Sequence, residues 1–213
     1  MLLYAPALSE ERRYVGAVIP ADPILNVALI VPRTEAEGPG VRFAVWVQGC
    51  PLRCPGCCNP EMLEEKPATS MKASDVVAAA VAAGVEGVSL LGGEPTAQAA
   101  GFAAVAKGVR AHGLSVMIFS GFTLAELRAR NDDATNDLLA NTDLLVDGRY
   151  VETRRTTQRR WIGSENQVLH HLTDRYAKDD PRFLEDNALE IRFKNGVVTV
   201  NGFPIKGALT VIP

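Results

Sequence analysis

Short apolar runs alternate with amphipathic stretches along most of this chain. The apolar runs predict five strands, at residues 24–31, 42–48, 87–91, 114–119 and 143–147. The stretches between the later runs carry apolar residues at helical spacing and predict four helices, at about residues 72–83 and 97–112, from 123 onward, and at about 134–140. Glycines end the first two helices at Gly84 and Gly113, and Thr123 with Glu126 has the spacing of a capping box at the start of the third.

Strands that alternate with helices through short links favour a parallel sheet with helices on the outside. A complete eight-unit barrel takes about 250 residues. Residues 42–213 are only 172 residues long and contain four firm strands, so we expect an incomplete (partial) parallel β/α barrel. At the end of the chain, Asn195-Gly196 lies between alternating apolar residues and the run 197–200, which predicts a C-terminal β-hairpin at 189–204.

The pattern divides the chain into two parts. Residues 1–23 are irregular and form an N-terminal extension, and residues 24–213 form one domain with a cysteine loop at 49–60. The chain has 213 residues, 47% of them hydrophobic, which is enough for a core. Its formal net charge of −3 excludes a general nucleic-acid binder. We expect a cytoplasmic protein with no membrane partner, because no apolar run approaches the roughly 18 residues of a membrane span and no signal peptide is evident.

All four cysteines, Cys50, Cys54, Cys57 and Cys58, lie within nine residues. Disulfides in a stabilising framework would be spread along the chain, so this group indicates metal ligands or redox groups instead. Cys50, Cys54 and Cys57 follow a predicted strand, and the carboxyl end of a strand is where α/β folds build their sites. Three thiolates can hold an iron–sulfur cluster and leave one iron open to another ligand.

Zinc is the competing interpretation. It would need a fourth ligand to complete a tetrahedral site, from Cys58, His170 or His171. Cys58 is adjacent to Cys57, and neighbouring cysteines rarely reach one cluster together. Iron–sulfur ligation by Cys50, Cys54 and Cys57 is therefore our first hypothesis and zinc the second.

Three further strand ends are expected at the same rim. Gly92-Gly93-Glu94-Pro95 follows one strand, and its glycines would let the backbone approach a ligand while Glu94 accepts a hydrogen bond from an ammonium group. Ser120 and Asp147 end the next two strands and are candidate cofactor contacts. For Asp147 the alternative role is a helix or turn cap.

Five arginines, at positions 149, 154, 155, 159 and 160, follow the last strand of the alternating region. Such a run usually forms a solvated loop, and we assign a functional role to Arg149 alone, against an acidic partner or a substrate carboxylate. Residues 149–165 should then flank a wide groove beside the cysteine loop.

Cys50-Pro-Leu-Arg-Cys54-Pro-Gly-Cys57 resembles the CxxxCxxC signature of the radical S-adenosylmethionine superfamily. Around it, Gly38-Pro-Gly-Val-Arg42, Asn59-Pro-Glu61, Leu91-Gly-Gly-Glu-Pro95, Asp143-Leu-Leu-Val-Asp147 and Gly163-Ser-Glu-Asn166-Gln167 are similar to the motifs of glycyl-radical-enzyme activases. The greatest likeness is to the family of anaerobic ribonucleotide reductase activating proteins, over roughly residues 24–170.

The resemblance implies a 4Fe–4S cluster on Cys50, Cys54 and Cys57, whose open iron binds S-adenosylmethionine. It implies that Asn59, Gly92, Gly93, Glu94, Pro95, Ser120 and Asp147 contact these cofactors. It also implies an oxidoreductase that cleaves S-adenosylmethionine reductively to a 5′-deoxyadenosyl radical, and two partners, a glycyl radical enzyme and a low-potential electron donor such as flavodoxin or ferredoxin.

Cys58 departs from the family pattern, which has an aromatic residue or histidine before Asn-Pro. It could be a packing substitute, a redox-active thiol or a hydrogen donor. Two other functions stay open: a radical S-adenosylmethionine enzyme that modifies a small molecule or peptide, and a non-catalytic zinc or iron–sulfur module. The residues identify no substrate, because variable loops select it.

Overall fold

A computed structural model describes residues 22–194 and 197–203. Seven strands form one mixed sheet in the order β3-β1-β2-β4-β5-β6-β7. They span Ile24–Thr34 (β1), Arg42–Val47 (β2), Thr69–Lys72 (β3), Gly87–Gly92 (β4), Ser115–Ser120 (β5), Leu144–Asp147 (β6) and Val168–His171 (β7). The predicted N-terminal extension lies almost wholly outside the described residues and stays a prediction.

The centre of the sheet is parallel, as predicted. β2, β4, β5 and β6 run in one direction, whereas β1 pairs antiparallel with β2 and β3, and β7 pairs antiparallel with β6. β3 and β7 were not among the strands expected from the sequence. Both are four-residue edge strands that contain two or more polar residues, so they lack the apolar run that indicated the central strands.

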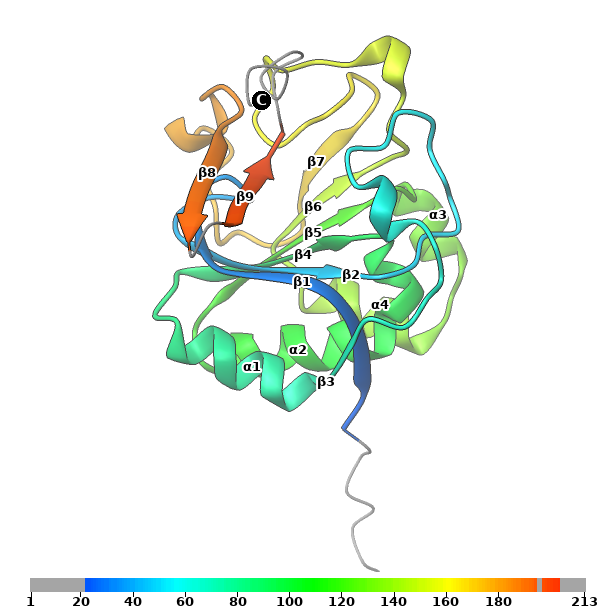
Figure 1. The fold of residues 1–213 in the computed structure, drawn as a ribbon, viewed down its shortest axis with the longest axis vertical. Helices are drawn as coiled ribbons and strands as arrows, with labels where there is room; N and C mark the ends of the chain where they lie inside the picture. The colour runs from blue at the N-terminus through cyan, green and yellow to red at the C-terminus, as the bar shows by residue number, and fades with distance from the viewer. Residues whose placement is uncertain (1–21, 195–196, 204–213) are drawn as a thin grey trace, which may run out of the picture.

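Four α-helices follow the strands at the predicted places: α1 (Ala73–Ala82), α2 (Ala99–Ala111), α3 (Leu124–Ala129) and α4 (Asp133–Ala140). The capping box is present, with the Thr123 hydroxyl accepting from the Glu126 amide and the Glu126 carboxylate accepting from the Thr123 amide. A 3₁₀ turn at Pro95–Gln98 precedes α2 and shifts its start two residues later than predicted. Figure 1 shows α1, α2 and α4 together on one side of the sheet.

The sheet is buried on both faces, which explains its continuous apolar strands. On the helix side, alternate strand residues such as Phe43 and Val45 pack with Phe102 and Val105 of α2 in the main core. On the other side, Ala44 and Trp46 belong to a smaller apolar cluster with Met62 and Leu91. The cysteine loop, residues 150–167 and the C-terminal hairpin lie over this second face (Figure 1).

The predicted C-terminal hairpin is confirmed over its described residues. β8 (Leu189–Lys194) and β9 (Val197–Gly202) pair antiparallel and form a separate two-stranded sheet. The fold is therefore of the mixed α/β type, with a main sheet that is parallel at its centre. The described strands of this sheet do not close into a barrel. Within the described ranges, no helix has the length and apolar character needed to cross a membrane.

Candidate iron–sulfur and cofactor site

A cavity of about 310 Å³ opens on the face of the sheet away from the helices, at the carboxyl ends of the parallel strands. All four cysteines line it, and so do most of the other predicted site residues: Asn59, Gly92, Gly93, Glu94 and Ser120. Residues from many separate stretches of the chain meet here, among them the cysteine loop, the glycine-rich turn and the end of β5 at Ser120, which the sequence had indicated. The topology therefore brings the cysteine loop and the glycine-rich turn to one place.

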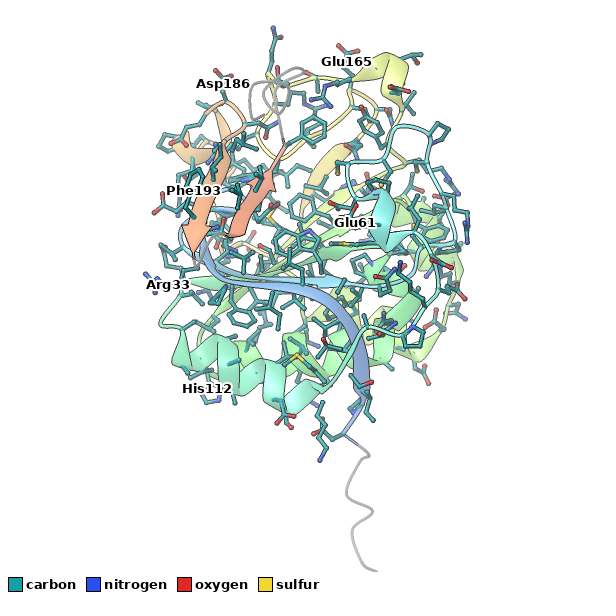
Figure 2. All side chains as sticks on the ribbon, in the orientation of Figure 1. Arg33, Glu61, His112, Glu165, Asp186 and Phe193 are labelled. Carbon is teal, nitrogen blue, oxygen red and sulfur yellow. The ribbon has the colours of Figure 1, made fainter. Side chains whose placement is uncertain are left out.

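Backbone hydrogen bonds anchor both ends of the cysteine loop. The amides of Gly49 and Cys50 donate to the carbonyls of Met62 and Leu63, at 2.9 and 3.2 Å. The side-chain amide of Gln48 donates to the carbonyls of Glu61 and Glu64, at 3.1 and 2.7 Å. Figure 2 shows Glu61 on the cavity side of the sheet and His112 among the helices on the opposite side. The loop between these anchors is thus a short span of chain that is fixed at its base.

The thiols differ in their surroundings. Cys50 is buried, Cys54 and Cys57 are half-buried, and Cys58 is exposed. Burial raises the pKa of Cys54. A hydrogen bond with the Cys58 thiol lowers the pKa of Cys57 to about 6 and raises that of Cys58. The lowered pKa favours Cys57 over Cys54 and Cys58 as a thiolate ligand.

The donor set fits an iron–sulfur cluster, since three thiols from one loop face one cavity. Across residues 22–194 and 197–203, no three His, Cys, Asp or Glu side chains already surround a common metal position. Binding a cluster therefore requires the cysteine side chains to turn toward one point. The histidines proposed for a zinc site lie elsewhere: His170 Nε2 is 2.9 Å from Asp147, and His171 Nδ1 is 3.2 Å from the Tyr176 carbonyl.

The two glycines of the rim turn pack against the backbone at both ends of the cysteine loop, a contact that was not expected from the sequence. A Cβ on Gly93 would lie 2.1 Å from the carbonyl oxygen of Gly49 and 2.8 Å from that of Met62. The Gly93 amide also donates to Val47 at 2.7 Å, and the Glu94 amide to Gly49 at 2.9 Å. The glycines let this turn contact the base of the cysteine loop, in addition to lining the cavity.

Glu94 is 1% exposed, and its carboxylate joins two strand ends. Oε1 accepts from the Thr96 amide at 2.9 Å, the Thr96 hydroxyl at 2.6 Å and the Ser120 hydroxyl at 2.9 Å. Oε2 accepts from the Gly121 amide alone, at 2.9 Å. A carboxylate offers about four acceptor positions over its two oxygens, so Oε2 is the oxygen with capacity for a further donor. Ser120, predicted as a direct contact, holds Glu94 in place.

Asp147 and Pro95 do not belong to the cavity lining. The Asp147 carboxylate accepts from the amide of Leu124, the first residue of α3, and lies beside His170. This is the capping role that the sequence analysis considered as its alternative. The Asp147 side chain thus positions the start of α3 and does not line the cavity.

Arg149 contacts α3 and does not line the cavity. Its guanidinium donates to Glu126 at 3.0 Å and lies 5.5 Å from the ring centre of Phe122. The capping bonds from Thr123, together with Arg149, hold the pKa of Glu126 at about 2. Of the predicted groove residues 149–165, Tyr150, Trp161 and Gly163 reach the cavity wall. Part of the predicted flank is therefore present, and none of its five arginines belongs to the lining.

Several lining residues were not predicted as site residues. Trp46 and Trp161 contribute indole rings, Glu37 contributes a buried carboxyl group, and residues 200–203 contribute the end of the hairpin. Gln167 holds the loop at 163–164 by accepting from both of its amides, at 2.9 and 3.1 Å. Only Gln167 belonged to a recognised motif. The others are brought to the cavity by contacts between distant segments, which no local pattern records.

Comparison with known proteins gives matches over most of the described chain. Residues 36–170 match the model of the "4Fe-4S single cluster domain" family. The chain is 30% identical over 166 residues to an anaerobic ribonucleoside-triphosphate reductase-activating protein from Vibrio cholerae, an alignment that covers 70% of this chain and 99% of the relative. It is 41% identical over 68 residues to a pyruvate formate-lyase-activating enzyme from Listeria monocytogenes, covering 29% and 27% of the two chains. Among solved structures, QueE from Escherichia coli aligns with a TM-score of 0.41 at 19% identity, over 47% of this chain and 53% of that chain.

Proposed function

Because the chain belongs to the family of anaerobic ribonucleoside-triphosphate reductase-activating proteins, built on a 4Fe–4S single cluster domain, we propose that its cavity binds one 4Fe–4S cluster and one molecule of S-adenosylmethionine. The protein is a radical S-adenosylmethionine oxidoreductase of the glycyl-radical-enzyme activating type. The observation that carries the assignment is the meeting of three loop cysteines with the Glu94 turn in one cavity.

When bound, the cluster would supply one electron for cleavage of the sulfonium C–S bond of S-adenosylmethionine to methionine and a 5′-deoxyadenosyl radical, which would take a hydrogen atom from a glycine of the partner. Cys50, Cys54 and Cys57 would hold three irons of the cluster. Cys57 would lose its proton more readily than Cys54, because its pKa is lowered to about 6 whereas that of Cys54 is raised. Cys58 stays outside this ligand set.

Glu94 would orient the second cofactor. Glu94 lines the cavity, its Oε2 has spare acceptor capacity, and the ammonium group of S-adenosylmethionine is a matching donor. Ser120, Thr96 and Gly121 would act as positioning residues that fix the carboxylate. Asn59 and the backbone of Gly92 and Gly93 complete the proposed contacts, and Trp46 and Trp161 would exclude water from the wall.

The volume of the cavity indicates what remains outside it. About 310 Å³ lies at the lower end of the range for small-molecule pockets. A cluster and S-adenosylmethionine would occupy most of that space, so the glycine must enter from the open side as part of a partner chain. We propose that the curved sheet acts as a partial barrel, and that the gap in this barrel is the side from which the partner's glycine enters. An electron donor such as flavodoxin or ferredoxin would approach the exposed tip of the cysteine loop.

The assignment is tested by anaerobic reconstitution of four single variants, Cys50→Ala, Cys54→Ala, Cys57→Ala and Cys58→Ala. We expect the first three to lose the electron paramagnetic resonance signal of the reduced cluster, and Cys58→Ala to keep about four irons per chain. With dithionite as the reductant, Cys58→Ala should still form 5′-deoxyadenosine and the other three variants should not.

A cluster that survives loss of Cys54, or that is lost with Cys58, would contradict the ligand assignment. Zinc without iron after anaerobic purification would favour a non-catalytic metal module. Formation of 5′-deoxyadenosine that increases with a metabolite and does not respond to the reductase would favour the small-molecule enzyme. The hairpin forms part of the cavity wall, as a pocket for a small molecule would require, so this alternative needs to be tested.

A further inference from the structure

The hairpin lies beyond the family match, which ends at residue 170, yet it reaches the cavity. Val200, Asn201, Gly202 and Phe203 all line the wall. The end of the hairpin is fixed there, because the Phe203 ring packs 6.2 Å from that of Tyr150 and the Arg155 guanidinium lies 4.3 Å from the Phe203 ring centre. A segment added to the family domain has become part of its active-site wall.

One face of the hairpin is docked by polar contacts. The Asn201 amide donates to Thr34 at 2.7 Å, the Arg192 guanidinium donates to the Arg33 carbonyl, and Glu190 accepts from the Glu35 amide at 2.7 Å. These side chains come from alternate positions and therefore share one face. These contacts hold that face against the end of β1 and against Glu35, the residue that follows it.

The opposite face carries exposed apolar side chains. Phe193 is 77% exposed, and Ile191 and Val198 are each 42% exposed. Figure 2 shows Phe193 beside β8, at the margin of the molecule and on the opposite side of the sheet from the helices. Phe193 pairs with Val198, and Ile191 pairs with Val200 in the cavity wall. The apolar strip therefore runs continuously from the outside of the molecule to the cavity.

The free edge of β9 adds backbone groups to this strip. In the described residues, β9 pairs with β8 alone. The Gly202 amide donates to Glu37 at 2.7 Å and not to β8. Residues of an antiparallel pair alternate between bonding to the partner strand and facing away from it. By this alternation, Val200 and Val198 also direct their N–H and C=O groups away from β8, along the edge that leads into the cavity.

We propose that β9 is the docking strand for the glycine-bearing segment of the partner enzyme, which adds to its free edge as a further strand. The inference rests on the proposed function. A glycine has no side chain, so an activase must recognise it through backbone contacts and through the residues on either side. Strand addition supplies backbone hydrogen bonds, and alternate side chains of the added strand supply specificity. The apolar strip selects a segment with apolar residues on one face, and β9 delivers its glycine to the cavity.

The test compares Val198→Pro with Val198→Thr. Proline removes the outward amide and is tolerated at the free side of an edge strand, whereas threonine keeps the amide and the shape. Val198 does not line the cavity, so 5′-deoxyadenosine formation with dithionite and no partner should be unchanged in both variants. The probe is the anaerobic ribonucleoside-triphosphate reductase of the same organism. Its Kd for the full-length protein, and the KM for appearance of its glycyl radical signal, should each rise about tenfold in Val198→Pro, as expected for one lost hydrogen bond, and change less than about twofold in Val198→Thr.

Each other result contradicts the proposal. Unchanged Kd and KM in Val198→Pro would show that the edge is not used. A wild-type dimer in sedimentation velocity that Val198→Pro converts to monomer, with KM unchanged, would assign the edge to a second copy of the chain. Wild-type protein that forms no 5′-deoxyadenosine, or that forms it and places no radical on the reductase, would overturn the activase assignment and the docking strand with it.

Discussion

The cavity has two kinds of wall, and they are held by different forces. The rim of the parallel sheet is locked by backbone contacts, such as the bonds from Gly93 to Val47 and from Glu94 to Gly49. The hairpin is attached through side chains, chiefly Asn201, Arg192 and Glu190, most of them partly exposed. A wall held by close backbone contacts, which we call the backbone lock, tolerates few substitutions. A wall held by side-chain hydrogen bonds can change by substitution of single residues. The wall held by backbone contacts lies within the family match over residues 36–170, whereas the hairpin lies beyond it.

The largest expected effect breaks the backbone lock. In Gly93→Ala, the new methyl group would lie within 3 Å of three backbone atoms of Gly49 and Met62, none of which can move independently. We expect a loss of more than about 3 kcal/mol in the free energy of unfolding, together with loss of iron binding. Urea unfolding and iron analysis after reconstitution measure both. Gly113→Ala is the control for steric contact, since Gly113 has no atom within 4 Å of the new methyl, and its positive φ of 78°, which Gly93 does not share, is the only source of strain there. It should cost about 1 kcal/mol and retain iron. Equal losses in the two variants would refute the backbone lock.

The second effect concerns the junction between the two walls. Burial raises the pKa of Glu37 to about 7, against an ordinary value of 4.5, although the Gly202 amide and Asn201 donate to it. Its proton is bound more tightly in the folded chain than in the unfolded one. Stability from this group is therefore complete below about pH 4.5 and declines as the pH rises to about 7.

We expect the difference in unfolding free energy between Glu37→Gln and wild type to grow by up to about 3 kcal/mol over that pH interval, in favour of the variant. Glutamine keeps the acceptor for Gly202 and cannot ionise. Urea unfolding of both proteins at half-unit steps from pH 4 to pH 8 measures the difference. A flat difference would mean that Glu37 is not buried against the hairpin.

The residues in these two tests differ in whether the sequence alone could identify their roles. The cysteine loop, the Glu94 turn and the Thr123 capping box were all identified, because each is encoded within a few consecutive residues. The edge strand at Val168–His171 was missed, since two histidines interrupt its apolar pattern. Glu37 was missed for a different reason: its role depends on Gly202, 165 positions away.

The assignment of Asp147 shows the same limit within a motif. The strand end was predicted, but whether its carboxylate faces a cofactor or a helix depends on the position of the Leu124 amide. The motif fixed the place of the residue in the sheet, and the packing of α3 decided its contact. Local patterns thus locate strand ends well and leave the direction of each side chain to tertiary structure.

A third test compares a carboxylate in each wall. Glu94→Gln would place an NH₂ group against the donors that now surround Glu94, leaving a buried donor without an acceptor. We expect a cost of about 2 kcal/mol and weaker S-adenosylmethionine binding, measured by urea unfolding and by equilibrium dialysis. In the hairpin, Glu190→Gln should cost less than about 1 kcal/mol, because Glu190 is only partly buried and solvent can replace lost contacts. A larger loss at Glu190 than at Glu94 would reverse the comparison.

The smallest expected effect lies on the outer face of the hairpin. Phe193→Ser replaces a side chain that is 77% exposed, so almost no apolar surface returns to water on unfolding. We expect the free energy of unfolding to change by less than about 0.5 kcal/mol. The matched control is Phe43→Ala, where a ring that is 2% exposed leaves the core and about 3–5 kcal/mol should be lost. A large exposed aromatic ring that adds nothing to stability is free to serve a contact with another chain, whereas a substantial loss in Phe193→Ser would mean that the ring is needed within its own chain and that the apolar strip is part of the fold.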